Sequence, residues 1–407
     1  MRILRNIGTL ARCLPAGAQD QIHLIENAAL VWSDATIRWV GPEAELPASF
    51  DGWPSEDARG RLVVPGLVDS HTHLAFAGWR AGEFELRLKG KSYLEIAAGG
   101  GGIVSTMTKT RAASPDELMT RCRSHLAAMA RLGVTTVEAK SGYGLDFENE
   151  LKILRVYRDL AGESTQHIVP TLLAAHVVPP EYKQRREEYV ALVIDRIIPA
   201  VAGEKLAKFC DVFVEESAFS VEEARRIFEA GKRHGLRPKL HADQLTSCGG
   251  AQLAGEVGAV SADHLEQVST DGMGRLLAGG VIAGSLPFAS LYLGGAPMPA
   301  RQLISLGVPV AVATDFNPGS APSYHLPMAM TLACLIQRMT PAESLKGATI
   351  IAARAVGLED LVGSLEEGKS ADFAVIDAPS VTDWLYHLTP NACVLTVARG
   401  RELWRAA

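Results

Sequence analysis

The sequence lacks the features that mark membrane-spanning or exported proteins. Its 407 residues contain no apolar run of about 18 residues, the length that a membrane-spanning helix needs. The first residues, 1–6, do not begin the long apolar segment of a secretory signal. Six cysteines are scattered without a Cys-x-x-Cys pair, which favours reduced thiols over a disulfide framework. We therefore expect a cytoplasmic protein with no membrane partner.

Charge of one sign is not concentrated in the sequence either. Lys and Arg number 40 against 46 Asp and Glu, the formal net charge is -6, and no block of basic residues occurs. Nucleic-acid-binding proteins usually gather Lys and Arg on one face, so we expect no nucleic-acid partner. Hydrophobic residues make up 47% of the chain, which is enough to fill a substantial core.

The order of the apolar runs predicts a barrel of parallel strands. Within residues 62–355, strand-like runs alternate with helical patterns such as 115–132 and 221–234, the signature of repeated βα units. Eight strands are predicted to begin near Val63, Thr135, Ile168, Asp211, Pro238, Val260, Val281 and Pro309. Eight units predict an α/β fold with a closed (β/α)8 TIM-like barrel, although an open doubly wound sheet would leave a similar pattern.

The two ends of the chain carry a different pattern. Short apolar runs separated by turn residues occur within 1–61, and similar runs return at 371–377 and 393–400. Such runs are typical of short antiparallel strands. We therefore predict that residues 1–61 and 356–407 pair into a small β-sandwich domain, beside a catalytic barrel domain of residues 62–355.

Polar residues stand at the ends of several predicted barrel strands. His71 and His73 follow the first strand, and their i, i+2 spacing points both imidazoles to one face of an extended chain. His241, His264 and Asp315 end three later runs. A parallel barrel gathers its active-site groups at these ends, and imidazoles with a carboxylate suit zinc or iron. The sequence therefore predicts a metal site, although His-x-His alone would fit an ordinary buried strand.

Three other features could be given a functional role, but each of them has a simpler interpretation. The glycine run Gly99–Gly102 lacks the Lys-Ser/Thr of a phosphate-binding loop, so we expect a mobile loop over the site. Lys140 follows the second strand, where a carbamylated lysine could bridge two metals, but a solvated or ion-paired lysine is the simpler expectation. Cys248 lies in no nucleophile motif, and we expect it to be buried.

Several longer motifs carry a resemblance to a known family. The segment 65–73, the later His241, His264 and Asp315, and the tail 363–373 resemble the amidohydrolase superfamily. Within it, the closer resemblance is to the imidazolonepropionase family, and it runs nearly from end to end. The segments that carry this closer resemblance are 73–80, 138–144, 173–176, 241–244 and 314–320.

The resemblance implies an activity and a role for each residue of the metal site. The activity is hydrolysis of 4-imidazolone-5-propanoate to N-formimidoyl-L-glutamate, in histidine degradation. One Zn2+ or Fe3+ per subunit would be held by His71, His73, His241 and Asp315. Asp315 would also move the proton, and His264 would orient the water or stabilise the oxyanion, unless it is only a hydrogen-bond partner behind the ligands. A homodimer is the state that the family leads us to expect.

The resemblance also implies contacts with the propionate and the planar ring of the substrate. The substrate-binding residues would be Arg80, Tyr143, His176, Gln244, Asn317, Gly319 and Ser320. Arg80 can bind a carboxylate with two hydrogen bonds, although it could instead pair with Glu83 or Glu85. Gln244 stands where some family members carry a glutamate, and an amide cannot act as a base. His176 is expected to donate a hydrogen bond.

Other interpretations stay open at this point. Residues 317–320 alone would predict a turn. A different cyclic amidohydrolase or a deaminase would share the metal pattern, but a neutral purine site has no use for Arg80 as a carboxylate anchor. A catalytically inactive scaffold has no physical reason to keep so costly a cluster of polar groups. The ligand types suit zinc and iron equally.

Overall fold

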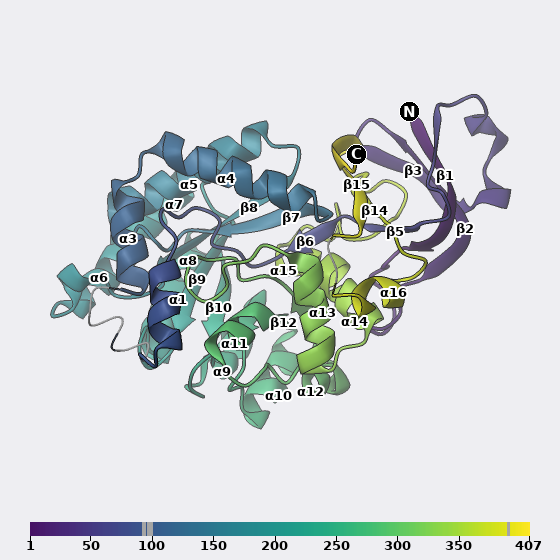
Figure 1. The fold of residues 1–407 in the computed structure, drawn as a ribbon. Helices are drawn as coiled ribbons and strands as arrows, with labels where there is room; N and C mark the ends of the chain where they lie inside the picture. The colour runs from purple at the N-terminus through teal and green to yellow at the C-terminus, as the bar shows by residue number, and fades with distance from the viewer. Residues whose placement is uncertain (92–94, 96–100, 389–390) are drawn as a thin grey trace.

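The computed structural model describes residues 1–91, 95, 101–388 and 391–407, and Figure 1 shows a barrel ringed by helices beside a separate sheet. Each barrel strand lies parallel to its neighbours in chain order. The strands are β6 (Leu67–Asp69), β7 (Val134–Lys140), β8 (His167–Ala175), β9 (Phe209–Val214), β10 (Arg237–Ala242), β11 (Ser261–His264), β12 (Ile282–Ser285) and β13 (Val310–Val312). The predicted α/β barrel is confirmed.

The barrel closes between its first and last strands. Just beyond β6 and β13, the N–H of His73 donates to the carbonyl of Phe316 at 2.9 Å. The N–H of Asp315 donates to the carbonyl of His71 at 3.0 Å. These hydrogen bonds join the two edges that an open doubly wound sheet would leave apart, so the closed form of the fold is the correct one.

One strand start was predicted wrongly. Seven of the eight starts lie within two residues of the observed strands, but the run that begins at Val63 divides between the two sheets. Its first half is β5 (Leu62–Pro65), which pairs with the terminal strands, and only the second half is β6. Gly66 separates the halves, and a Cβ there would lie 2.2 Å from the hydroxyl oxygen of Thr135. Only a glycine fits this close approach of the chain to β7.

Helices surround the barrel, and their starts follow from local sequence. Ser114 and Ser220 each form a capping box with a glutamate three residues on, which begins the helices predicted at 115–132 and 221–234. The helices of the first half are α1 (Ala81–Leu88), α3 (Ile103–Ala112), α4 (Pro115–Ala130), α5 (Phe147–Glu163), α6 (Arg186–Leu192), α7 (Ile198–Gly203) and α8 (Val221–Arg233). Those of the second half are α9 (Gly250–Val257), α10 (Thr270–Gly279), α11 (Pro287–Leu293), α12 (Ala300–Leu306), α13 (Leu326–Gln337), α14 (Pro341–Lys346), α15 (Ala352–Ala355) and α16 (Val381–Tyr386).

The two ends of the chain pair into the second sheet, where both termini lie (Figure 1). Its strands are β1 (Arg2–Ala11), β2 (Leu24–Ser33), β3 (Thr36–Pro42), β4 (Ser55–Asp57), β5, β14 (Phe373–Ile376), β15 (Cys393–Ala398) and β16 (Arg401–Arg405). Trp32 of β2 contacts Phe373 of β14 with ring centroids 5.1 Å apart, although β1 and β5 lie between these strands in the sheet. The sheet therefore curls around its own apolar core. The domain division at residues 1–61 and 356–407 stays a prediction.

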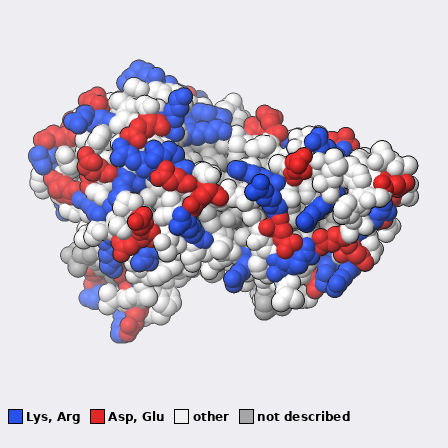
Figure 2. All heavy atoms as spheres, turned by 90° about the horizontal axis from the view of Figure 1, so that it is seen from above, with Lys and Arg blue, Asp and Glu red and all other residues white. Residues whose placement is uncertain are grey.

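Helix length, surface charge and the state of the cysteines are three further features of the structure. No helix in the described part of the chain is long and apolar enough to cross a bilayer. Figure 2 shows acidic and basic side chains intermixed over the face that it draws. All six cysteines are free, and Cys248 is half-buried. The loop expected at Gly99–Gly102 falls partly on residues outside the described ranges.

A glutamine from the N-terminal segment fastens the terminal sheet to the barrel. The side-chain amide of Gln19 donates to the carbonyls of Val310 at 2.8 Å and Glu343 at 3.2 Å, and its oxygen accepts the N–H of Val310 at 3.0 Å. Val310 is the first residue of β13, so this contact lies at the end of the barrel opposite to the predicted site. The side chain thus pairs with the start of β13 as a neighbouring strand would.

We expect Gln19→Ala to lower the free energy of unfolding by about 1–3 kcal/mol, because it removes the partners of buried backbone groups at Val310. Denaturation in urea measures the change. Asp20→Ala, at the exposed neighbouring residue, is the control and should change stability by no more than about 0.5 kcal/mol. An equal change in the two variants would contradict the role given to Gln19.

Candidate metal centre and active site

Five side chains from four strand ends meet inside the mouth of the barrel. His71 and His73 follow β6, His241 lies in β10, His264 ends β11 and Asp315 follows β13. All are at most 3% exposed. The carboxylate Oδ1 of Asp315 lies 3.5 Å from Nε2 of both His71 and His73, and Nε2 of His73 lies 3.5 Å from Nε2 of His241. Every ligand-type residue that the sequence predicted is therefore within one cluster.

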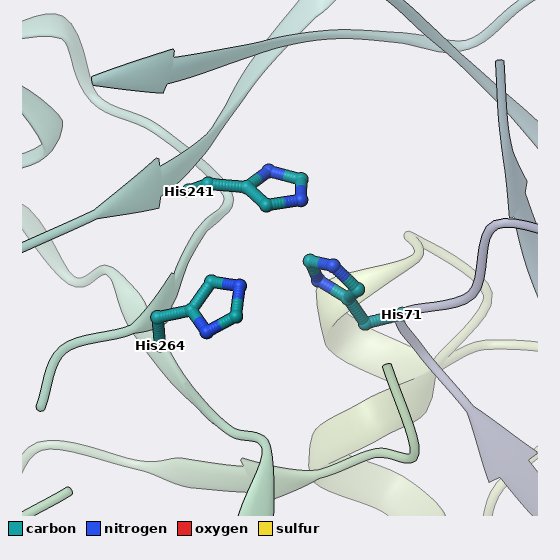
Figure 3. Close-up of side chains that lie close together, drawn as sticks. All are labelled: His71, His241 and His264. Carbon is teal, nitrogen blue, oxygen red and sulfur yellow. The ribbon is translucent and has the colours of Figure 1, made fainter. Parts of the chain in front are cut away.

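The nitrogens of this cluster are arranged as a cation would require. Nδ1 of His71 donates to Asp263 at 2.7 Å, and Nδ1 of His241 donates to Asp211 at 3.0 Å. Each ring therefore carries its proton on Nδ1, and its Nε2 presents a lone pair. Nε2 of His71 is buried without a hydrogen-bond partner. Figure 3 shows His71, His241 and His264 converging from three separate segments. Convergent lone pairs repel one another unless a cation lies between them, so the residues fit a metal ion.

The surroundings also keep two of these imidazoles neutral. Burial, followed by the charge of Lys140, lowers the pKa of His71 well below its ordinary value. Burial lowers the pKa of His241 to about 4, although Asp211 acts in the opposite direction. A neutral imidazole is the form that binds a metal, so these residues are ready as ligands at neutral pH.

Two residues of the cluster are held in uncommon backbone conformations. His264 has a φ of 79° and Asp315 a φ of 55°, in the left-handed region that side chains other than glycine rarely adopt. Asp243, two residues after His241, has a φ of 49°. Strain of this kind costs of order 1–3 kcal/mol per residue and is concentrated at functional sites. The turns at these strand ends therefore set the directions of the side chains. The backbone strain lowers the stability of the fold, and other interactions must offset it.

Behind the cluster lies a layer of buried charge whose role the sequence analysis missed. The Nζ of Lys140 lies 2.7 Å from Asp211, 2.9 Å from Glu138 and 3.8 Å from Asp263. The ion-paired interpretation of Lys140 is therefore confirmed, and its amino group is already held by carboxylates. The sequence signal that could have revealed this layer was the presence of charged residues inside otherwise apolar strands. Asp263 directly precedes His264, and Asp211 had been noted only as a strand start.

His264 faces the cluster but has its own carboxylate neighbour. Its Nδ1 lies 3.7 Å from Glu266, which in turn accepts a hydrogen bond from the hydroxyl of Ser290 at 2.8 Å. Burial lowers the pKa of His264, but Glu266 and then Asp315 outweigh burial, so the pKa lies above its ordinary value. The raised pKa increases the protonated fraction of the ring, and a protonated imidazole can donate a hydrogen bond toward the cluster.

Two aromatic residues line the cluster on the side of β7 and β8. The ring of His176 stacks on that of His73, with centroids 5.2 Å apart, and Tyr143 lies 5.7 Å from His73. Nδ1 of His176 donates to the carbonyl of Gly142 at 3.0 Å. Burial and the neighbouring His73 lower the pKa of His176, so its Nε2 is an acceptor. The expectation that His176 donates a hydrogen bond to substrate is therefore wrong for this tautomer.

A buried carboxylate that the sequence analysis did not single out holds the loop that carries Tyr143. Glu150 of α5 accepts backbone N–H groups from Gly142 at 3.1 Å, Gly144 at 2.8 Å and Leu145 at 2.9 Å. These hydrogen bonds satisfy the carboxylate on one side and fix the loop on the other. The position of Tyr143 beside the cluster therefore depends on α5.

Arg80 lies in a fixed position next to the loop that follows β13. Its Nε and Nη2 each lie 2.8 Å from a carboxylate oxygen of Glu83. A Cβ at Gly319 would lie 2.1 Å from Nη1 of Arg80, so a larger residue there would displace the guanidinium. Glu83 uses one edge of the guanidinium and leaves the N–H groups of Nη1 for another partner. The pairing with Glu83 is present, and it is compatible with a second carboxylate.

The remaining predicted contacts lie in two loops. The side-chain oxygen of Asn317 accepts the N–H groups of Gly319 and Ser320, both at 2.8 Å, and its Nδ2 donates to the carbonyl of Asp315 at 2.7 Å. The amide of Asn317 thus builds the turn that the residue types alone predict. Gln244 is half-buried, two residues beyond the end of β10.

Comparison with known proteins identifies the family. Residues 62–403 match the amidohydrolase family. The chain is 46% identical to an imidazolonepropionase of Geobacillus thermodenitrificans over 398 residues, which cover 97% of this chain and 94% of the relative. It is 48% identical to an imidazolonepropionase of Symbiobacterium thermophilum over 383 residues, which cover 93% and 90%. The chain belongs to the imidazolonepropionase family of amidohydrolases. The resemblance seen in the motifs is confirmed.

Solved structures of other enzymes share the fold of this imidazolonepropionase-family chain. A 5-methylcytosine deaminase of Klebsiella pneumoniae has a TM-score of 0.75 at 17% identity, covering 100% of this chain and 98% of its own. An atrazine chlorohydrolase of Arthrobacter aurescens, solved with zinc, has a TM-score of 0.74 at 17% identity, covering 99% and 95%. At this identity the likeness shows the architecture alone.

We expect His241→Ala to weaken Zn2+ binding by more than about 100-fold, because partners behind the ligands already account for about 10- to 100-fold. Metal content after dialysis, read by elemental analysis, measures the loss. His125→Ala is the control, since His125 packs against Phe76 and Phe316 instead of the cluster. Normal metal content in the His241 variant would exclude it as a ligand.

Proposed function

We propose that this chain hydrolyses 4-imidazolone-5-propanoate to N-formimidoyl-L-glutamate, a step of histidine degradation, with the help of one bound metal ion. The observation that carries the proposal is the convergence of buried imidazole nitrogens on Asp315 at the mouth of the barrel. Membership of the imidazolonepropionase family supports the choice of substrate. A cyclic amide is a poor electrophile and water a poor nucleophile, so the site has to activate both.

The metal ligands in this proposal are His71, His73, His241 and Asp315. Nitrogen and oxygen donors of this kind suit Zn2+ and Fe3+, and one ion per subunit fits the cluster. When bound, such an ion supplies Lewis acidity, which lowers the pKa of water to about 7 with zinc and polarises a carbonyl oxygen. The ligands themselves hold this charge where the strand ends meet and keep bulk water away, because all four are buried.

Asp315 is the proton carrier in this scheme. Burial raises the pKa of its carboxyl group, but the contact with His73 and the nearby His264 outweigh burial, so the pKa lies below its ordinary value. Asp315 is therefore ionised at neutral pH and accepts a proton from the attacking water. It then delivers the proton to the departing ring nitrogen, as a general base that becomes a general acid.

His264 stabilises the charge that develops on the carbonyl oxygen. Its raised pKa favours the protonated ring, which can donate a hydrogen bond to an oxyanion. Gln244 cannot take part in proton transfer because its amide is not a base, so it contacts the ring by hydrogen bonding. More of the proton transfer therefore falls on Asp315 and His264.

The substrate ring and its propionate are assigned to separate parts of the site. Tyr143 offers an aromatic face, and Nε2 of His176 accepts a ring N–H. Arg80, steadied by Glu83, binds the propionate through its remaining N–H groups. The turn built by Asn317 brings the last two predicted contacts, Gly319 and Ser320, beside this anchor.

Two finer proposals concern the setting of the reaction. A cytoplasmic location is supported by six unpaired cysteines. A homodimer is supported by apolar side chains exposed on α1 and α11, such as Leu88 and Leu291. Light scattering of the purified protein tests the dimer directly.

The first experiment follows the ultraviolet absorbance of freshly made 4-imidazolone-5-propanoate with the metal-loaded protein, against spontaneous decay of the substrate. We expect an accelerated loss of absorbance that falls to the spontaneous rate when a chelator is added and recovers with Zn2+, with formimidoylglutamate as the product. No acceleration by fully loaded protein would refute the proposed substrate. Release of ammonia from guanine or cytosine under the same conditions would favour a deaminase instead.

Arg80→Met should raise KM for the propanoate by about 10- to 150-fold, because a hydrogen bond to a charged group contributes about 1.5–3 kcal/mol. Steady-state kinetics with and without the acid on the ring measure the effect. Arg123→Met provides the matched control, since Arg123 forms a similar pair with Glu163 on the exposed surface. An equal rise in KM for a ring that lacks the acid would assign Arg80 another role.

A further inference from the structure

Five charged side chains are buried together directly behind the proposed metal ligands. Glu138 and Lys140 lie on β7, Asp211 on β9, Lys239 on β10 and Asp263 on β11, and none is more than 3% exposed. Removing charges from water costs several kcal/mol per ion, and well-packed apolar residues often stabilise a core as well or better. A barrel interior has no structural need for this arrangement, so a functional reason has to be sought in its contacts.

The contacts lead from one lysine to two of the ligands. Asp211 accepts Nδ1–H of His241 at 3.0 Å with one oxygen and a hydrogen bond from Lys140 at 2.7 Å with the other. Asp263 accepts Nδ1–H of His71 at 2.7 Å, and the same oxygen lies 3.8 Å from Nζ of Lys140. Lys140 therefore lies between the two carboxylates, and each carboxylate holds one imidazole.

A second buried lysine, Lys239, extends this layer of charged residues. Glu138 lies 2.9 Å from Lys140 and 2.8 Å from Lys239, and it accepts the hydroxyl of Thr171 at 2.6 Å. Lys239 also donates to the backbone carbonyl of Ser70 at 3.2 Å, in the residue before His71. The layer thus spans four barrel strands, β7, β9, β10 and β11, and it also contacts β8 and the turn that carries the first ligand.

We propose that Lys140, Asp211 and Asp263 are positioning residues that fix the orientation of two metal ligands, His241 and His71. This inference rests on the proposed metal site and names what makes that site rigid. A carboxylate that accepts Nδ1–H selects one tautomer, sets the rotation of the ring and increases the electron density at Nε2. Lys140 holds both carboxylates in place, because each would otherwise repel the other across the narrow barrel interior.

The test measures metal binding apart from turnover. Zn2+ affinity is obtained by competition with a chromogenic chelator on metal-free protein, and the visible absorption of the Co2+ form reports the geometry of the ligands. We expect Asp211→Asn and Asp263→Asn to weaken Zn2+ affinity by about 10- to 100-fold and to change the Co2+ spectrum. Retention of wild-type affinity and spectrum in both variants would overturn the proposal.

Lys140 is tested by a substitution that keeps the balance of buried charge. Lys140→Met alone leaves the carboxylates without their cation and risks misfolding. The double variant Lys140→Met and Glu138→Gln removes one charge of each sign, and we expect the same loss of affinity from it. If the folded double variant binds Zn2+ as the wild type does, Lys140 has no part in positioning.

The chain offers a matched control for a general loosening of the fold. Asp372 is also a buried carboxylate beside a buried histidine, with Oδ2 3.2 Å from Nε2 of His167, but it lies at the start of β14 and away from the ligands. Asp372→Asn should keep Zn2+ affinity within about twofold of the wild type, and an equal loss there would refute positioning. If the wild-type chain itself binds no Zn2+, the proposed metal site fails, and with it the function.

Discussion

The site depends above all on the closure of the barrel. The backbone of His71 accepts a hydrogen bond from that of Asp315 at 3.0 Å, and this contact joins segments separated by more than half of the chain. The carboxylate of Asp69 supports the same seam by accepting the N–H and the hydroxyl of Thr314 at 3.0 and 2.6 Å. If the first and last strands did not meet, His71 and Asp315 could not share a metal ion.

Closure alone does not give a metal site, because the side chains also need fixed directions. Their directions come from strained turns at His264 and Asp315 and from the carboxylates behind His71 and His241. The same physical rule applies to the residues proposed to bind substrate, since Glu83 holds Arg80 and Glu150 holds the loop of Tyr143. In each case a buried or half-buried carboxylate fixes the position of the functional group. The site therefore consists of functional groups and of further groups that orient them.

Much of this could be read from the sequence because strand ends have a clear signal. An apolar run followed by histidine or aspartate places that residue at the barrel mouth, and the five predicted residues do meet there. The run from Val63 was predicted to be one barrel strand, but Gly66 divides it between two sheets. The apolar pattern within a run does not show which strands the run pairs with. Asp211 and Asp263 were missed as partners of the ligands for the same reason, since hydrogen bonds across strands depend on register. The acceptor role of His176 depends on a carbonyl in another loop.

The topology of the terminal sheet has a consequence for how the chain is made. β1 and β5 are close in sequence, but β5 finds its other neighbour only in β14, more than 300 residues later. The apolar face that includes Trp32 cannot meet Phe373 until more than 300 further residues have been synthesised. Long-range pairing of this kind is slow and leaves unpaired strand edges exposed in the meantime. The earlier strands of this sheet therefore stay uncovered until the later strands are made, and their apolar face is exposed to aggregation in the meantime.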